Sequence, residues 1–208
     1  MTVTLAARWQ GLWTGLGLAA PAGLLQALLD AYGEPQRHYH TLQHLGECFA
    51  LFDTVRQLAD HPLEVELALW FHDSVYDVHA HDNEARSSDW ADHALRAAGL
   101  PIDTCARIHA LIMATCHDAL PDSNDARLLT DIDLAILGAA PERFDEYERQ
   151  IRLEYGYVAQ AVFERERAKV LQRFLDRPQL YATPQLRGLL ESRARDNLSR
   201  AMHRSGFR

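Results

Sequence analysis

Residues 62–77 read PLEVELALWFHDSVYD, and this stretch decides the fold class. A proline opens it, residues 63–71 are apolar apart from Glu64 and Glu66, and the pair His72-Asp73 follows. Proline is favoured in the first turn of a helix, and a helix that is apolar on nearly every side belongs in a protein core. The stretch therefore predicts a buried helix that ends in an imidazole and a carboxylate.

Helical periodicity continues on both sides of this segment. Prolines and glycines separate the periodic stretches, and no alternating strand pattern or hairpin signal interrupts them. The N-terminal stretch predicts a helix and a turn, and residues 74–82 predict a loop. We expect an all-α fold in a single domain, residues 1–208, with further helices over 21–32, 41–58, 83–98, 102–115, 124–139, 142–155, 157–175 and 183–202.

Composition limits the classes of partner. The chain of 208 residues carries 21 Lys and Arg against 29 Asp and Glu, a formal net charge of −8. This balance argues against extended nucleic acid as a partner, and no apolar run reaches the length of a membrane span. Three cysteines, Cys48, Cys105 and Cys116, form no CxxC pair and predict reduced thiols in a cytoplasmic protein. Most of the eleven histidines lie between His38 and His117, which is a first indication of a metal.

The dipeptide His-Asp occurs at residues 72–73, 81–82 and 117–118. Only the sequence around each copy can therefore indicate which one belongs to a functional site. Only His72-Asp73 ends an apolar helix. Burying these two polar groups costs several kcal/mol, about 2–7 for a neutral group, unless both are satisfied. A divalent cation would satisfy both; the alternative is a hydrogen-bonded core pair without metal.

Two further patterns in the sequence favour a metal site over a hydrogen-bonded core pair. In RHYHTLQHL, residues 37–45, His40 and His44 stand four residues apart on one face of a helix. In RLLTDIDLAILG, residues 127–138, Asp131 and Asp133 interrupt an otherwise apolar helix, where aspartate is costly. A metal-binding or catalytic role explains both placements.

In this order of motifs the chain resembles the HD superfamily of metal-dependent phosphohydrolases. YHTLQH, FHDSVYD, NEARS and DIDLAILG are similar to a bacterial branch of predicted phosphohydrolases, and the resemblance covers about residues 35–175. It implies an HD-type helical bundle, with the N-terminal helices and the C-terminal helix packed on this metal-site core. It also implies one or two divalent ions in a cleft, with Mn, Mg, Co, Ni, Zn and Fe as candidates.

The resemblance also implies roles for individual residues. The metal ligands would be His44, His72, Asp73 and Asp133, with Asp131 as the alternative last ligand. Asp77 and Glu84 are the candidates for proton transfer in catalysis. The candidates for substrate binding are Arg37, which could hold a phosphate, and His40 and His117.

The expected function is metal-dependent hydrolysis of a phosphate ester or a nucleotide-like phosphorylated small molecule. One alternative is a di-iron HD-type oxygenase, for which His93 and His117 would supply extra ligands. Another is a non-catalytic regulatory module that binds a metal or a nucleotide. Apolar positions near Trp9 and Trp13, expected to be exposed, are compatible with a homodimer.

Overall fold

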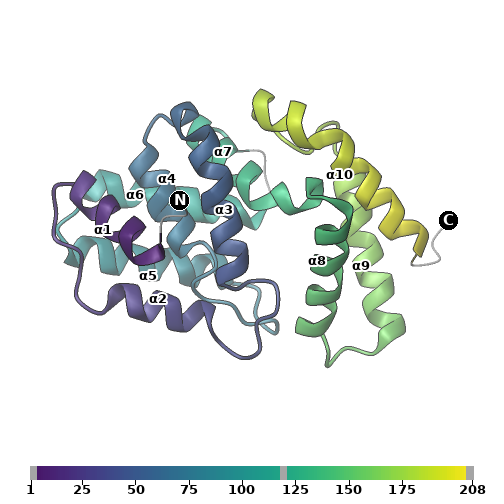
Figure 1. Cartoon of the computed structure of the whole chain (residues 1–208). Coiled ribbons are helices and arrows are strands. Elements are labelled where there is room, and N and C mark those ends of the chain that lie inside the picture. Colours follow the sequence, from purple (N-terminus) through teal and green to yellow (C-terminus); the bar gives the residue numbers. More distant parts are fainter. Residues whose placement is uncertain (1–3, 118–120, 205–208) are drawn as a thin grey trace. The chain divides into compact units, whose positions relative to one another are not determined.

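The computed structural model describes residues 4–117 and 121–204, and within these ranges every regular element is a helix (Figure 1). The predicted all-α class is confirmed. The chain divides into two compact units, Met1–Thr130 and Asp131–Arg208, each described below by itself, and the single domain stays a prediction. None of the helices within the described ranges is long and apolar enough to cross a membrane.

The first unit is built around one buried helix, α4 (Pro62–Phe71), whose residues from Val65 to Phe71 are all at most 3% exposed. Its main neighbours are four helices, and Figure 1 shows the helices of this unit grouped around it. These are α1 (Leu5–Gly15), α3 (Leu42–Val55), α5 (Asn83–Ala97) and α6 (Ile102–Met113). The remaining elements of this unit are α2 (Leu24–Tyr32), the 3-10 turns η1 (Arg56–Leu58) and η2 (Ala114–Cys116), and the first part of α7 (Asn124–Asp133).

The two acids of α4 are buried but paired. Glu66 accepts hydrogen bonds from Arg8 and Arg56, and Glu64 accepts two from Arg107, at 2.6 and 2.8 Å. Because each carboxylate meets a guanidinium, the helix can be buried on all sides without leaving a charge unpaired. These pairs explain why the apolar pattern of α4 tolerates two glutamates.

The tryptophans of α1 lie in the core. Trp9 packs edge-on against Trp13 and Trp70, with ring centroids 5.5 and 5.1 Å apart, and both α1 tryptophans are 1% exposed. Trp9 and Trp13 themselves therefore belong to the core and not to an exposed apolar surface. The homodimer stays a prediction.

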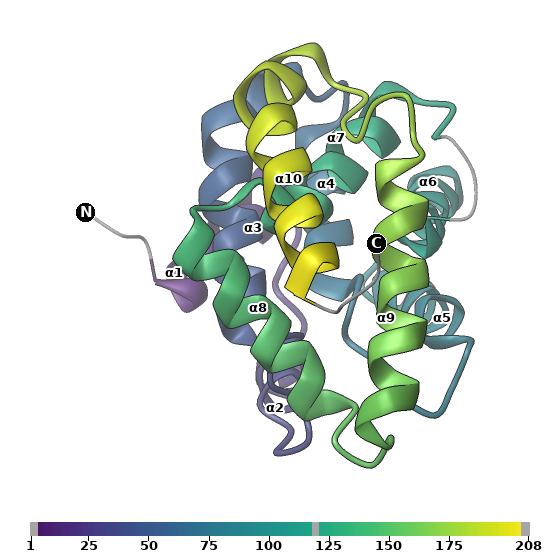
Figure 2. The same ribbon diagram turned by 90° about the vertical axis from the view of Figure 1, so that its right-hand side faces the viewer.

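The second unit contains the end of α7 and four further elements. They are the 3-10 helix η3 (Leu134–Gly138), α8 (Pro141–Glu154), α9 (Gln160–Leu175) and α10 (Pro184–Arg204). Figure 2 shows α8 and α9 joined by a loop at one end. Arg167 of α9 links them, because its guanidinium donates to Glu148 and to the Tyr147 hydroxyl at 2.5 and 2.8 Å.

Most predicted helix bounds hold to within about one turn, but residues 124–139 do not form one α-helix. The α-helix ends at Asp133 and tightens into η3. Packing explains the change, since a Cβ on Gly138 would lie 2.7 Å from the Leu190 Cβ. In addition, the Tyr181 hydroxyl donates to the Leu134 carbonyl at 3.1 Å. The tighter turn lets α10 approach the backbone of η3.

Candidate metal centre

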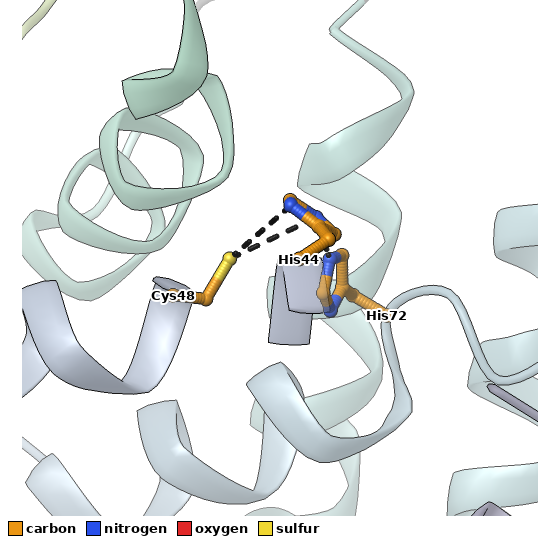
Figure 3. A group of neighbouring side chains, drawn as sticks. All are labelled: His44, Cys48 and His72. Atoms are coloured by element: carbon orange, nitrogen blue, oxygen red, sulfur yellow. Dashed lines mark hydrogen bonds between the residues drawn. The ribbon is translucent and has the colours of Figure 1, made fainter. Parts of the chain in front are cut away.

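Helices α3 and α4 bring two imidazoles together in the first unit. His44 lies in the first turn of α3, which begins after Thr41, whose hydroxyl accepts the Gln43 N–H at 3.2 Å. His72 directly follows the last residue of α4. The two Nε2 atoms are 3.1 Å apart, and both side chains are almost fully buried (Figure 3).

The hydrogen bonds of His72 fix which ring nitrogen carries a proton. Its Nδ1 lies 2.8 Å from the Leu69 carbonyl oxygen, which can only accept, so Nδ1–H is the donor. In the neutral ring the lone pair is then on Nε2, the atom that faces His44. A backbone carbonyl that orients a histidine in this way is the usual arrangement behind a metal ligand.

Asp73 adds a carboxylate to the pair. Its Oδ2 lies 3.1 Å from Nε2 of His72 and 3.4 Å from Nε2 of His44. Burial by itself would raise the pKa of Asp73, but the neighbouring imidazoles, His72 and then His40 and His44, outweigh it and hold the pKa well below its ordinary value. The carboxylate is therefore ionised at neutral pH.

These three atoms fit a divalent ion. Ligand atoms about 2.1 Å from an ion, at angles between octahedral and tetrahedral, lie about 3.0–3.4 Å from one another. The observed separations are 3.1, 3.1 and 3.4 Å. The lone pair of His72 and the carboxylate of Asp73 are both acceptors, so a single N–H on His44 serves one of them at a time. A cation would satisfy all three atoms together.

Cys48 lies beside His44 in the same helix, a contact that the sequence reasoning missed. It follows His44 by one helical turn, is 2% exposed, and places its Sγ 3.7 Å from Nε2 and 3.8 Å from Nδ1 of His44 (Figure 3). The ligand atoms of His44, Cys48 and His72 all lie within 4.8 Å of one another. The spacing of four residues along α3, from His44 to Cys48, was the signal.

Arg37 supports the backbone of the centre. It is 5% exposed, and its guanidinium donates to the carbonyl oxygens of Asp73 at 2.5 Å, Ser74 at 3.1 Å and His40 at 3.3 Å. A further bond reaches Glu34 at 2.9 Å. The guanidinium thus donates four hydrogen bonds to the protein itself and positions the turn after α4. These bonds use N–H groups that binding of a phosphate would need.

His40 lies beside the cluster in the turn before α3, so the prediction that it shares a helix face with His44 is wrong. Its ring stacks on Tyr76, with centroids 4.0 Å apart, and lies 6.2 Å from the ring of His44. The side chain is half-buried. His40 is therefore close enough to contribute positive potential to Asp73 when protonated, as the direction of the Asp73 pKa reflects.

The predicted acid–base residues lie on the next loop and helix. Asp77 is exposed, and one of its carboxylate oxygens accepts the His79 N–H at 2.9 Å. Together with Arg37, Ser74 and Tyr76 it lines a cavity of about 830 Å³. Glu84 lies half-buried in the first turn of α5. Neither carboxylate is part of the cluster around His72.

The remaining histidine candidates differ in their surroundings. His117 is half-buried and ends η2 with a left-handed backbone, φ 57°. Its neighbour in the third His-Asp copy, Asp118, lies outside the described residues. His93 is exposed on α5, as expected for a residue on a solvated helix face.

The two acids at the end of α7 have different environments in the second unit. Asp131 is 2% exposed, and its two carboxylate oxygens accept the N–H groups of Ala182 and Thr183 at 2.9 and 2.6 Å. It thus satisfies two backbone donors in the residues just before α10. Asp133, two residues further on, is half-buried.

Comparison with known proteins adds no family to these observations. No protein-family model matches the chain, and neither a curated protein nor a solved structure matches it. The fold and the cluster define an all-α protein with a His, Cys and Asp group that could hold a metal ion.

Proposed function

We propose that this protein is a metal-dependent phosphohydrolase that acts on a phosphate ester or a nucleotide-like small molecule. The observation that carries the proposal is the convergence of His44, His72 and Asp73, with separations of 3.1–3.4 Å and the His72 tautomer set by Leu69. These three side chains would hold the ion. The order of the motifs along the chain, which resembles the HD superfamily, supports the choice of reaction.

We propose Asp133 as the fourth ligand. Both oxygens of Asp131 accept backbone N–H groups just before α10, which gives that acid a structural role. Asp133 is the last residue of α7 and is followed by Leu134, and this Asp-Leu pair resembles the last ligand position of the HD superfamily. Asp131 would then act on α10 and not on the ion.

When bound, a divalent ion supplies Lewis-acid activation of water and of a phosphoryl oxygen. The chain's own contribution is to hold the ligands in place before binding. Leu69 holds the His72 ring, Arg37 holds the carbonyl of Asp73, and the low pKa of Asp73 keeps its carboxylate charged. Ligands held in this way lose little conformational freedom on binding.

The substrate would occupy the cavity of about 830 Å³ beside the turn that follows Asp73. This volume is of the size that small-molecule sites have. Asp77 lines the cavity, and we propose it, or Glu84, as the group that transfers a proton. His40 and His117 stay candidates for contact with the substrate.

The test combines metal analysis with a phosphatase and phosphodiesterase screen in Mn, Mg, Co and Ni. His72→Ala should lose the bound ion and the activity while keeping its helical circular dichroism, and the control His93→Ala, on an exposed position, should keep both. Asp133→Ala should lower metal retention more than Asp131→Ala. Full metal content and activity in His72→Ala would overturn the proposal, and two irons per chain with oxygen-dependent turnover would favour the oxygenase instead.

A further inference from the structure

We propose that Arg86 and Trp90 select the substrate: Arg86 binds an anionic group, and Trp90 stacks on a planar ring of the same molecule. This inference rests on the proposed function, which places the substrate in the cavity of about 830 Å³, and it narrows the substrate to phosphate esters that contain a planar ring. Both residues line that cavity. They lie four residues apart on α5, so their side chains share one face of the helix.

Arg86 has a guanidinium that the chain leaves largely uncommitted. Its side chain is 49% exposed, and within the described residues its guanidinium makes one ion pair, with Asp82 at 4.0 Å, and no hydrogen bond. Arg37, the other arginine of the same lining, donates four hydrogen bonds to the protein. An exposed pair such as Arg86 and Asp82 contributes little, so an anion can displace Asp82 and use the planar fork of Arg86. The anion-binding role that the sequence suggests for Arg37 therefore suits Arg86 better.

Trp90 offers a surface for the ring of the substrate. It is half-buried, whereas Trp9, Trp13 and Trp70 are at most 1% exposed. Its ring meets that of Phe71 at 86°, with centroids 5.9 Å apart, so the core fixes one part of the side chain while the uncovered part lines the cavity. Stacking on an aromatic side chain tolerates different planar rings, because each has a π face.

Three carboxylates also line the cavity, and each has a hydrogen-bond partner in the chain. The partners are Arg37 for Glu34 at 2.9 Å, Gln26 for Asp30 at 2.8 Å, and the His79 N–H for Asp77 at 2.9 Å. The charge of Glu34 is thus offset by an arginine, whereas Asp30 and Asp77 keep theirs. Binding of an anion therefore depends on direct contact with Arg86 and not on the net charge of the lining, and removal of Arg86 should have a large effect.

The loop after α4, which contributes to the cavity, is tied to α5 before any ligand binds. The Ser87 hydroxyl accepts the Val75 N–H at 3.0 Å. The side chain of Asn83 accepts the Asp77 N–H at 3.0 Å and donates to the Asp77 carbonyl at 2.9 Å. Because these bonds join the loop to α5, the two side chains of α5 are held relative to the loop, and little ordering is needed when a ligand binds.

The test compares three probes on the full chain without metal, so that no ester is hydrolysed during the measurement. Adenosine monophosphate carries a ring and an anion, adenosine carries the ring alone, and ribose phosphate carries the anion alone. Calorimetric titration should show that Arg86→Ala binds adenosine monophosphate about tenfold or more weakly, with adenosine changed less than about twofold. Trp90→Leu should weaken adenosine monophosphate and adenosine about fivefold or more and change ribose phosphate less than about twofold.

Two further variants complete the experiment. Arg96→Ala is the matched control, because Arg96 is a half-exposed arginine of the same helix that does not line the cavity, and it should bind the probes as the wild type does. Adenosine monophosphate should also quench the fluorescence of the wild type, and this quenching should be lost in Trp90→Phe, because the other three tryptophans are buried. Trp90→Phe keeps a ring for stacking, and it replaces the leucine variant if the lost contact with Phe71 prevents folding.

The outcomes separate this inference from the function beneath it. If Arg86→Ala and Trp90→Leu bind adenosine monophosphate as the wild type does, or if the wild type binds none of the probes at millimolar concentration, this inference is wrong, whatever the metal analysis shows. If both variants weaken binding as expected, but the wild type holds no ion and hydrolyses no ester, the cavity is a ligand site and the proposed hydrolase is wrong.

Discussion

Arg37 offers the clearest test of how the centre is built, because two roles for it predict different results. The sequence suggests a phosphate-binding residue. The structure gives it three hydrogen bonds to the carbonyls of His40, Asp73 and Ser74 from a buried position. We therefore expect Arg37→Ala to destabilise the metal-free chain and to weaken metal binding, before any substrate is present.

The magnitude follows from the groups that the substitution leaves behind. Each carbonyl that loses its partner in a buried place costs about 1–3 kcal/mol. The guanidinium also packs near the rings of Tyr32 and Tyr76, 5.5 and 5.6 Å from their centroids, and this contact is lost. Relief of the cost of burying the guanidinium offsets part of the sum. A net loss of about 3 kcal/mol is expected, and Arg37→Lys should recover a fraction because an ammonium cannot span three carbonyls.

The assay is urea unfolding followed by tryptophan fluorescence. All four tryptophans, Trp9, Trp13, Trp70 and Trp90, lie in the first unit, so the signal reports the unit that holds Arg37. Arg86→Ala is the control, since its side chain is 49% exposed and its ion pair with Asp82 is 4.0 Å long; its effect should be within about 0.5 kcal/mol. A stable Arg37→Ala with normal metal affinity and only weaker substrate binding would refute the positioning role and restore the phosphate role.

Two further predictions concern stability. Burial raises the pKa of Tyr32 from 10.0 to about 12, so the phenol ionises at a lower pH in the unfolded chain than in the folded one. The free energy of unfolding should therefore fall by about 2–3 kcal/mol between pH 10 and 12. In unfolding followed by fluorescence, Tyr32→Phe should lack this part of the alkaline decline, and a decline identical to that of the wild type would contradict the prediction. Gly138→Ala should lower the free energy of unfolding by about 1–3 kcal/mol, because the new Cβ would lie 2.7 Å from the Cβ of Leu190. Gly188→Ala on α10 is the control, because its new Cβ would meet nothing within 4 Å, and it should raise the free energy of unfolding by about 0.5–1 kcal/mol. Thermal melts followed by circular dichroism report both glycine variants, and equal effects would show that the contact with Leu190 can relax.

The helices were predictable because their signals are local. The apolar run after Pro62 and the breaks at glycines and prolines depend only on neighbouring residues, and they place most helices correctly. The change from α7 to η3 was not predictable from such signals. It depends on Leu190 and Tyr181, which lie about fifty residues away and act through packing against Gly138 and a bond to Leu134.

The candidate site, like the fold, was predictable from the sequence only in part. His44, His72 and Asp73 were predictable because polar residues in apolar helices are costly, and the structure brings these three together. Chemical type alone could not separate a ligand from a residue that supports the backbone.

Arg37 and Asp131 illustrate the difference. Each has the right chemistry for a phosphate or an ion, yet each is committed to backbone groups that lie 36–37 and 51–52 residues away in sequence, respectively. Cys48 shows the opposite case, because no sequence pattern marked it, yet its thiol lies 3.7 Å from Nε2 of His44. Arg37 and Asp131 therefore show that the partners of a polar side chain in the folded chain, more than its residue type, identify a structural role.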